Sequence, residues 1–142
     1  MDTRARLGTN SEKIISETLE GETIVINLET GTYYSMNAAA SRIWADVLAG
    51  GSAEDIVRRA AERCAEKDTA AVAATEFVVR LADEGLVATV SGEPVRFDPA
   101  EAFAPLPFEA PTLDRYDDMQ EMLLADPIHD VDTAGWPKRR EA

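Results

Sequence analysis

The residues best suited to chemistry lie near the carboxyl end of the chain, in the stretch ADPIHDVD. His129, the one histidine of the sequence, stands there among Asp126, Asp130 and Asp132. An imidazole beside carboxylates can bind a divalent metal ion or act as a general base near neutral pH. The spacing, however, matches no recognised set of metal ligands, and the segment lies in a proline-rich region. We favour a capped turn on a solvated acidic segment, and we predict no metal, no cofactor and no catalytic residue.

Cys64 is the other reactive side chain, and it is the single cysteine among 142 residues. It has no partner for an internal disulfide and belongs to no CxxC pattern, so we expect a small buried residue. The sequence shows neither a nucleophile–base pair nor a phosphate-binding loop. A small enzyme that uses His129 therefore ranks last, and we predict that the chain is not an enzyme.

The net charge of the chain argues against some classes of binding partner. The chain has 14 basic and 27 acidic residues and a net charge of −13. This balance argues against nucleic acid and against an anionic membrane surface, because both need lysine and arginine. No apolar run is long enough to cross a bilayer, and the N-terminus lacks an apolar signal core, so we expect a cytoplasmic protein with peptide or protein partners.

The chain divides where the prolines begin, since all seven follow residue 90. Proline removes a backbone donor and fixes φ, so this change marks the end of regular packed structure. We predict a flexible N-terminus at 1–11, a compact domain at 12–90, and a proline-rich acidic tail at 91–142.

Within the compact domain, alternating apolar residues predict three strands at 13–18, 23–28 and 32–36, joined by short turns. Helices follow: one capped by Asn37 and ending at the Gly-Gly pair 50–51, one capped by Ser52, and one from about Thr69 to Gly85. The sequence LVATV adds a last short strand. The predicted fold is α+β and winged-helix-like, with a three-stranded antiparallel meander followed by three helices and an extended tail.

These elements carry a series of short motifs: TGTYYSMN at the third strand, IW in the first helix, GG, SAEDIV, and LADEGLV at the end of the third helix. In this order they resemble the PqqD-like family, which is named from pyrroloquinoline quinone biosynthesis and is also called the RiPP recognition element. The resemblance covers about residues 12–90. Met36 stands where the family usually has leucine, and the tail has no counterpart in the shortest members.

The resemblance implies a non-catalytic chaperone of natural product biosynthesis that binds the leader segment of a ribosomally made precursor peptide and delivers it to a modifying enzyme. The leader is expected to add as a strand beside the third strand and to lie against the third helix. Physical reasoning agrees, because an unpaired strand edge offers backbone groups that an extended peptide can satisfy. The predicted peptide-binding residues are Thr32, Tyr33, Tyr34, Ser35, Met36, Ala73, Ala74, Phe77, Val78 and Leu81.

These residues also have a purely structural interpretation. The tyrosines more often pack within a sheet, and apolar residues at helical spacing more often belong to a core. We expect Trp44 in the core and Phe77 to serve both roles. Nearby acidic residues, among them Glu76, Asp83 and Glu84, favour a ligand with some basic character.

The tail is rich in aromatic residues for a solvated linker. Residues 112–125 predict a short helix, and the anchors expected to dock a partner protein are Leu113, Tyr116, Met119, Leu123, Ile128 and Trp136. Two alternatives remain open: the tail wraps its own domain, or it folds into the peptide groove and competes with the ligand.

The leading prediction of function is leader binding by strand addition. The alternative is a winged-helix-like regulatory or protein-interaction adaptor that takes no part in peptide modification. DNA binding is disfavoured, since the third helix offers only Arg80 among several acids. An unpaired edge at 32–36 would also permit a homodimer by strand pairing. The leading prediction depends on that edge being open.

Overall fold

The computed structural model describes residues 3–97 and 106–117. Its elements along the chain are β1 (Leu7–Thr9), β2 (Ile14–Leu19), β3 (Glu22–Asn27), β4 (Tyr33–Met36), α1 (Ala38–Leu48), α2 (Ala53–Glu62), α3 (Lys67–Asp83), β5 (Val87–Thr89) and β6 (Leu113–Tyr116).

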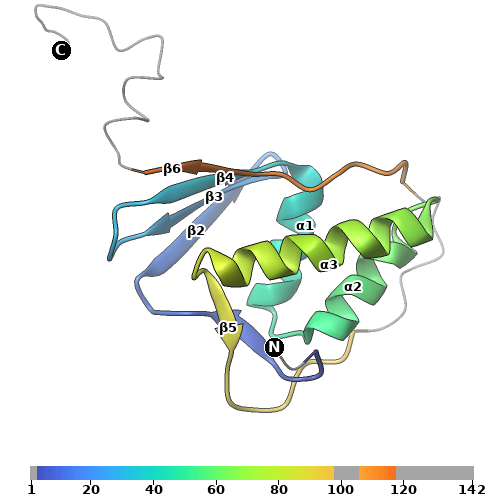
Figure 1. The fold of residues 1–142 in the computed structure, drawn as a ribbon, viewed down its shortest axis with the longest axis horizontal. Coiled ribbons are helices and arrows are strands. Elements are labelled where there is room, and N and C mark those ends of the chain that lie inside the picture. The colour runs from blue at the N-terminus through green and yellow to red at the C-terminus, as the bar shows by residue number, and fades with distance from the viewer. Residues whose placement is uncertain (1–2, 98–105, 118–142) are drawn as a thin grey trace, which may run out of the picture.

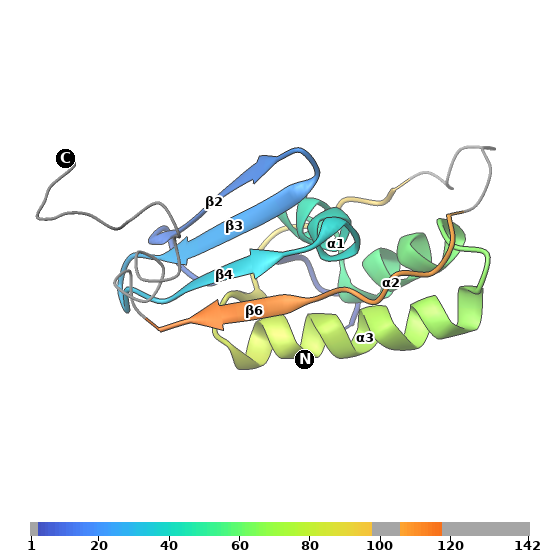
Figure 2. The same cartoon turned by 90° about the horizontal axis from the view of Figure 1, so that it is seen from above.

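The strands form two antiparallel sheets. The larger one has the order β2-β3-β4-β6, and the smaller one pairs β1 with β5. Figure 1 shows the three helices gathered on one side of the larger sheet, and Figure 2 shows its four strands in their order across the sheet. The α+β class is therefore confirmed. The predicted number of strands was wrong, because the meander β2-β3-β4 gains a fourth strand from the tail.

Local sequence signals determine where the β2–β3 hairpin turns and where helices α1 and α2 begin. Leu19 pairs with Glu22, and the two residues between them, Glu20 and Gly21, both have positive φ (53° and 83°), as a tight two-residue hairpin turn requires. The side chain of Asn37 caps α1 and that of Ser52 caps α2, as predicted.

One apolar core joins the sheet to the helices. Trp44 of α1 is 1% exposed, as expected, and its indole Nε1 donates a hydrogen bond to Ser16 Oγ on β2 at 3.0 Å. Val25 and Met36 from the sheet, together with Leu81 from α3, are buried in the same cluster. The face of the larger sheet that bears these buried side chains therefore packs against α1 and α3.

The N-terminal segment is more ordered than predicted. Within the span expected to be flexible, Leu7 is fully buried, and β1 pairs with β5 over three residues. The amide of Leu7 also donates to the carbonyl of Gly51 at 3.0 Å. A three-residue strand is too short to show an alternating pattern, so its partner far along the chain determines it.

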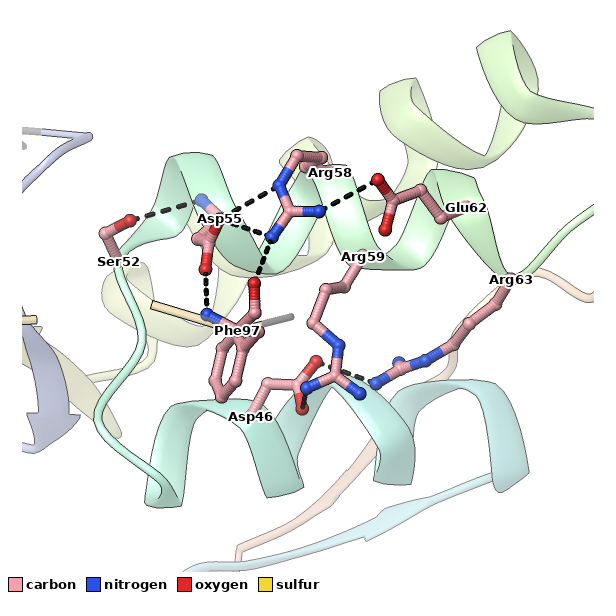
Figure 3. Close-up of polar contacts among 8 residues, drawn as sticks. All are labelled: Asp46, Ser52, Asp55, Arg58, Arg59, Glu62, Arg63 and Phe97. Carbon is pink, nitrogen blue, oxygen red and sulfur yellow. Dashed lines mark hydrogen bonds and ion pairs between the residues drawn. The ribbon is translucent and has the colours of Figure 1, made fainter. Parts of the chain in front are cut away.

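The first part of the tail is attached to α2 (Figure 3). Asp55 Oδ2 accepts a hydrogen bond from the amide of Phe97 at 2.8 Å, and Arg58 Nη2 donates to the Phe97 carbonyl at 3.1 Å. The guanidinium of Arg59 lies 4.5 Å from the centre of the Phe97 ring. The chain therefore leaves β5 along a defined path.

Two carboxylates of this network have pKa values shifted in opposite directions. Burial raises the pKa of Asp46, although Arg63 Nη2 at 2.9 Å and Arg59 oppose the shift. Burial also disfavours the charged form of Asp55, but the hydrogen bonds from the Phe97 amide and from Arg58 outweigh it and lower the pKa of Asp55. Ionised Asp55 therefore stabilises the attachment.

Candidate peptide-binding site

The edge of β4 is paired, and the prediction of an open edge at 32–36 was wrong. Strand β6 lies antiparallel to β4, with Tyr33 opposite Tyr116 and Met36 opposite Leu113. Figure 2 shows β6 on the outer side of β4, toward α3. The segment that occupies this edge comes from the tail, about 80 residues later in the chain. The edge therefore accepts an extended strand from outside the meander.

Asn37 connects this strand to the fold. Its Oδ1 accepts hydrogen bonds from the amides of Ala40 at 2.9 Å and Thr112 at 3.2 Å. Its Nδ2 donates to the carbonyl of Ala110 at 2.8 Å. One side chain thus caps α1 and holds the main chain of the tail as it enters β6. Because these contacts to the tail involve only backbone atoms, they place no demand on the tail's side chains.

Leu113 and Tyr116 supply the apolar contacts of β6. Leu113 is 3% exposed and belongs to the core cluster. The rings of Tyr116 and Tyr33 stack with their centroids 5.1 Å apart and their planes at 19°. Both residues were predicted to dock a partner protein, but in this structure they pack on their own domain.

Glu84, at the end of α3, forms a polar contact with β6. Its Oε1 accepts hydrogen bonds from Arg115 Nη1 at 2.8 Å and from the Tyr34 hydroxyl at 3.2 Å. Burial, and then the charge of Glu84, raise the pKa of Tyr34, so this phenol stays protonated and donates. The segment that occupies the edge does bring a basic residue to one of the acids singled out in the sequence.

Upstream of β6 the tail crosses the helices. The amide of Leu106 donates to the carbonyl of Arg63 at 2.8 Å, and the carbonyl of Leu106 accepts from the amide of Ala65 at 3.0 Å. The amide of Phe108 donates to Glu66 Oε1 at 3.1 Å. A cavity of about 30 Å³ lies between this segment and residues from α1, α2 and α3. Cys64 lines it and is half-buried, so the expectation of a buried cysteine was wrong.

The predicted groove residues of α3 lie mostly in the core. Ala74, Phe77, Val78 and Leu81 are at most 4% exposed, and Ala73 is half-buried. On β4, Tyr33, Tyr34 and Met36 are buried and Ser35 is half-buried. Thr32 precedes β4, and its carbonyl accepts from the amide of Asn27 at 2.8 Å. The peptide-binding role of all these residues stays a prediction.

The tail differs from its prediction in one further respect. Residues 113–116 form a strand, so the helix predicted from residue 112 is wrong there. The remaining predicted anchors, Met119, Leu123, Ile128 and Trp136, lie outside the described residues, as does His129.

The described part of the chain has neither a metal-binding cluster nor a membrane-spanning helix. Residues 3–97 and 106–117 contain no group of three or more histidine, cysteine, aspartate or glutamate side chains that could hold a metal ion. Among the same residues, no helix is both long and apolar enough to cross a bilayer. The β4 edge, with its neighbouring residues Asn37 and Glu84, is the candidate site for an extended peptide.

Comparison with known proteins agrees with this assignment. Residues 22–87 match the family model described as coenzyme PQQ synthesis protein D (PqqD). The chain is therefore similar to PqqD over these residues. The resemblance inferred from the sequence is thereby confirmed. No curated protein matches the chain.

A solved structure also resembles this PqqD-like chain. It is described as TbiB1 in complex with the TbiA(beta) leader peptide, and the match has 29% sequence identity and a TM-score of 0.50. The alignment covers 58% of this chain and 96% of TbiB1. The PqqD-like domain is thus similar to nearly all of a protein that was solved with a leader peptide, and this chain has additional residues beyond the match.

Proposed function

We propose that the PqqD-like domain binds the leader segment of a ribosomally made precursor peptide as an added strand at the β4 edge and delivers it to a modifying enzyme. The observation that carries this proposal is the pairing of β6 with β4. An extended segment from outside the meander already forms an antiparallel ladder at this edge. The similarity to TbiB1, which was solved with a leader peptide, supports a leader peptide as the ligand.

The geometry suits recognition of an extended peptide. Main-chain hydrogen bonds along β4 provide affinity with little demand on sequence, while side-chain contacts select the ligand. In this structure Asn37 holds backbone atoms of the tail, the Tyr33 ring stacks on Tyr116, and Glu84 accepts from Arg115, so a leader that takes the place of β6 would meet the same three groups. The proposed role requires no catalytic residue, so the domain acts as a non-catalytic adaptor for an enzyme that modifies the peptide.

A binding titration tests the proposal. The proposed function predicts that a short precursor peptide is encoded near this gene. The probe is the fluorescently labelled leader of that precursor, and its anisotropy is followed as the full-length chain is added. We expect binding at about micromolar affinity, because ordering a free peptide offsets part of the gain from the new contacts. Tyr33→Ala removes the aromatic surface and should weaken binding about tenfold.

The matched control is Ile15→Ala on β2, at the opposite edge of the sheet, where the side chain is 47% exposed. This variant should bind the leader as the wild type does. Equal weakening by both substitutions would place the leader elsewhere on the domain. Failure of the wild-type chain to bind the leader would contradict the proposal.

The paired edge also favours a second candidate. If β6 never leaves β4, the domain is a protein-interaction adaptor with no role in peptide modification. The same titration separates the two functions, since only a peptide-binding domain takes up the leader at the β4 edge.

A further inference from the structure

From the contacts of β6 we infer that segment 106–117 is a built-in occupant of the leader site, and that a leader must displace it. Its side chains then show which ligand the site selects: an extended peptide with an apolar residue, a basic residue two positions later, and an aromatic residue directly after the basic one. This inference rests on the proposed function and adds the class of ligand and its regulation.

Strand β6 lies outside the part of the chain that matches PqqD. The PqqD match ends at residue 87, before β6 begins. The three strands β2, β3 and β4 follow one another through short turns, and β6 joins them only at the outer edge of β4. Removal of β6 from the edge therefore breaks no connection between the elements of the matched domain. Such a strand can exchange with another that offers the same hydrogen bonds.

The side chains of β6 contact chemically distinct partners at the site. Leu113 fills a position in the core cluster opposite Met36. Arg115 donates to Glu84, and Tyr116 stacks on Tyr33. Apolar, basic and aromatic side chains at positions 1, 3 and 4 of the strand thus each meet a distinct partner. Asp114, at position 2, is exposed, so this position selects nothing.

Strand β6 is held on the domain by few buried side chains. Only Leu113 among the residues of β6 is buried, and the Arg115–Glu84 pair is partly exposed to solvent. Solvent-exposed ion pairs contribute little to stability. Because β6 is covalently joined to the domain, an incoming peptide competes with an effective concentration on the order of millimolar. The apparent affinity of a leader is lowered by the fraction of chains in which β6 covers the edge.

The experiment uses the full-length chain and a fluorescent synthetic peptide with the sequence of residues 106–117, LPFEAPTLDRYD. Leu113→Asp places a charge in the core position and should release β6. We expect this variant to bind the probe at least about tenfold more tightly than the wild type, which corresponds to ~1.4 kcal/mol. The matched control, Asp114→Asn, changes the exposed neighbour on the same strand and should bind as the wild type does.

A second variant tests the inference without a change in the core. Arg115→Glu leaves the core unchanged and places a carboxylate against Glu84, so it should also strengthen binding of the probe, by a smaller factor. Circular dichroism reports whether each variant is folded. A probe that carries glutamate in place of its arginine should bind the Leu113→Asp chain about tenfold less tightly than the original probe.

The outcomes separate the inference from the proposed function. If the released and wild-type chains bind the probe equally, or if neither binds it, then β6 is not a displaceable occupant and the inference is wrong. If the precursor leader binds wild type and Leu113→Asp with equal affinity, the inference fails while the proposed function stands. If the leader binds neither chain although the probe binds the released one, the proposed function fails.

Discussion

Asn37 offers a test of how the tail strand is held, because one of its contacts to the tail can be removed while the helix cap is kept. Oδ1 accepts from the amide of Ala40, which caps α1, and from the amide of Thr112 in the tail, whereas Nδ2 donates only to the tail, at the carbonyl of Ala110. Asn37→Asp keeps an acceptor for the cap and removes the donor to the tail. Asn37→Ala removes both.

The expected magnitudes follow from these contacts. Loss of an N-cap side chain typically costs ~1 kcal/mol, so Asn37→Ala should lower the free energy of unfolding of the domain by about that amount. Asn37→Asp should leave it unchanged or raise it slightly, since a carboxylate at a helix N-terminus is favourable. The same substitution turns a carboxylate oxygen toward the Ala110 carbonyl, so the free energy of opening β6 should fall by ~1–2 kcal/mol, about a fivefold to thirtyfold change.

Two measurements on the full-length chain separate the effects. Urea unfolding followed by circular dichroism reports the stability of the domain, and hydrogen exchange with mass spectrometry reports the protection of segment 106–117. Asn37→Asp should accelerate exchange in that segment without loss of global stability. If it destabilises the domain as much as Asn37→Ala does and leaves exchange of the segment unchanged, the assignment of the two atoms is wrong.

Three further predictions concern the rest of the domain. A Cβ at Gly51 would lie 2.5 Å from the Phe97 ring, so Gly51→Ala should displace that ring and cost ~1–3 kcal/mol in urea unfolding, whereas an unchanged midpoint would show that the ring moves freely. The lowered pKa of Asp55 means that its stabilisation is present above the ordinary value of 3.8 and is lost as the pH falls through the lowered folded-state value. Asp55→Asn should therefore flatten the fall in unfolding free energy below about pH 4, and an unaltered slope would contradict the pKa assignment. Ser16→Ala removes the acceptor of the Trp44 indole and should cost ~1 kcal/mol in thermal or urea unfolding, and no loss would indicate that water replaces the hydroxyl.

Much of the fold could be predicted because its signals are local. The side chains of Asn37 and Ser52 cap their helices by accepting hydrogen bonds from backbone amides three residues later in the chain. Strands β2 and β3 pair through a two-residue turn. Such contacts depend on neighbouring residues, which the sequence shows directly. The family resemblance rested on the same local order of elements.

The missed elements depend on contacts between residues far apart in sequence. Strand β1 pairs with β5, and β6 pairs with β4, so neither strand carries enough local pattern to identify it. Leu113 and Tyr116 are three residues apart, which fits a helix face as well as a strand. The prolines nearby, Pro107 and Pro111, favour extended structure at the residues that precede them, Leu106 and Ala110, but they do not decide between helix and strand from residue 112 on. The open edge was mispredicted for the same reason, because the occupant lies outside the compact domain.

The most direct test of the account is to locate the bound leader by NMR on the full-length chain. Isotope-edited spectra of the complex should show cross-strand contacts between the leader and Tyr33–Met36, and the contacts between β4 and β6 should disappear as the leader saturates the chain. A saturated complex in which the β4–β6 contacts persist and the leader lies elsewhere would contradict strand addition at this edge.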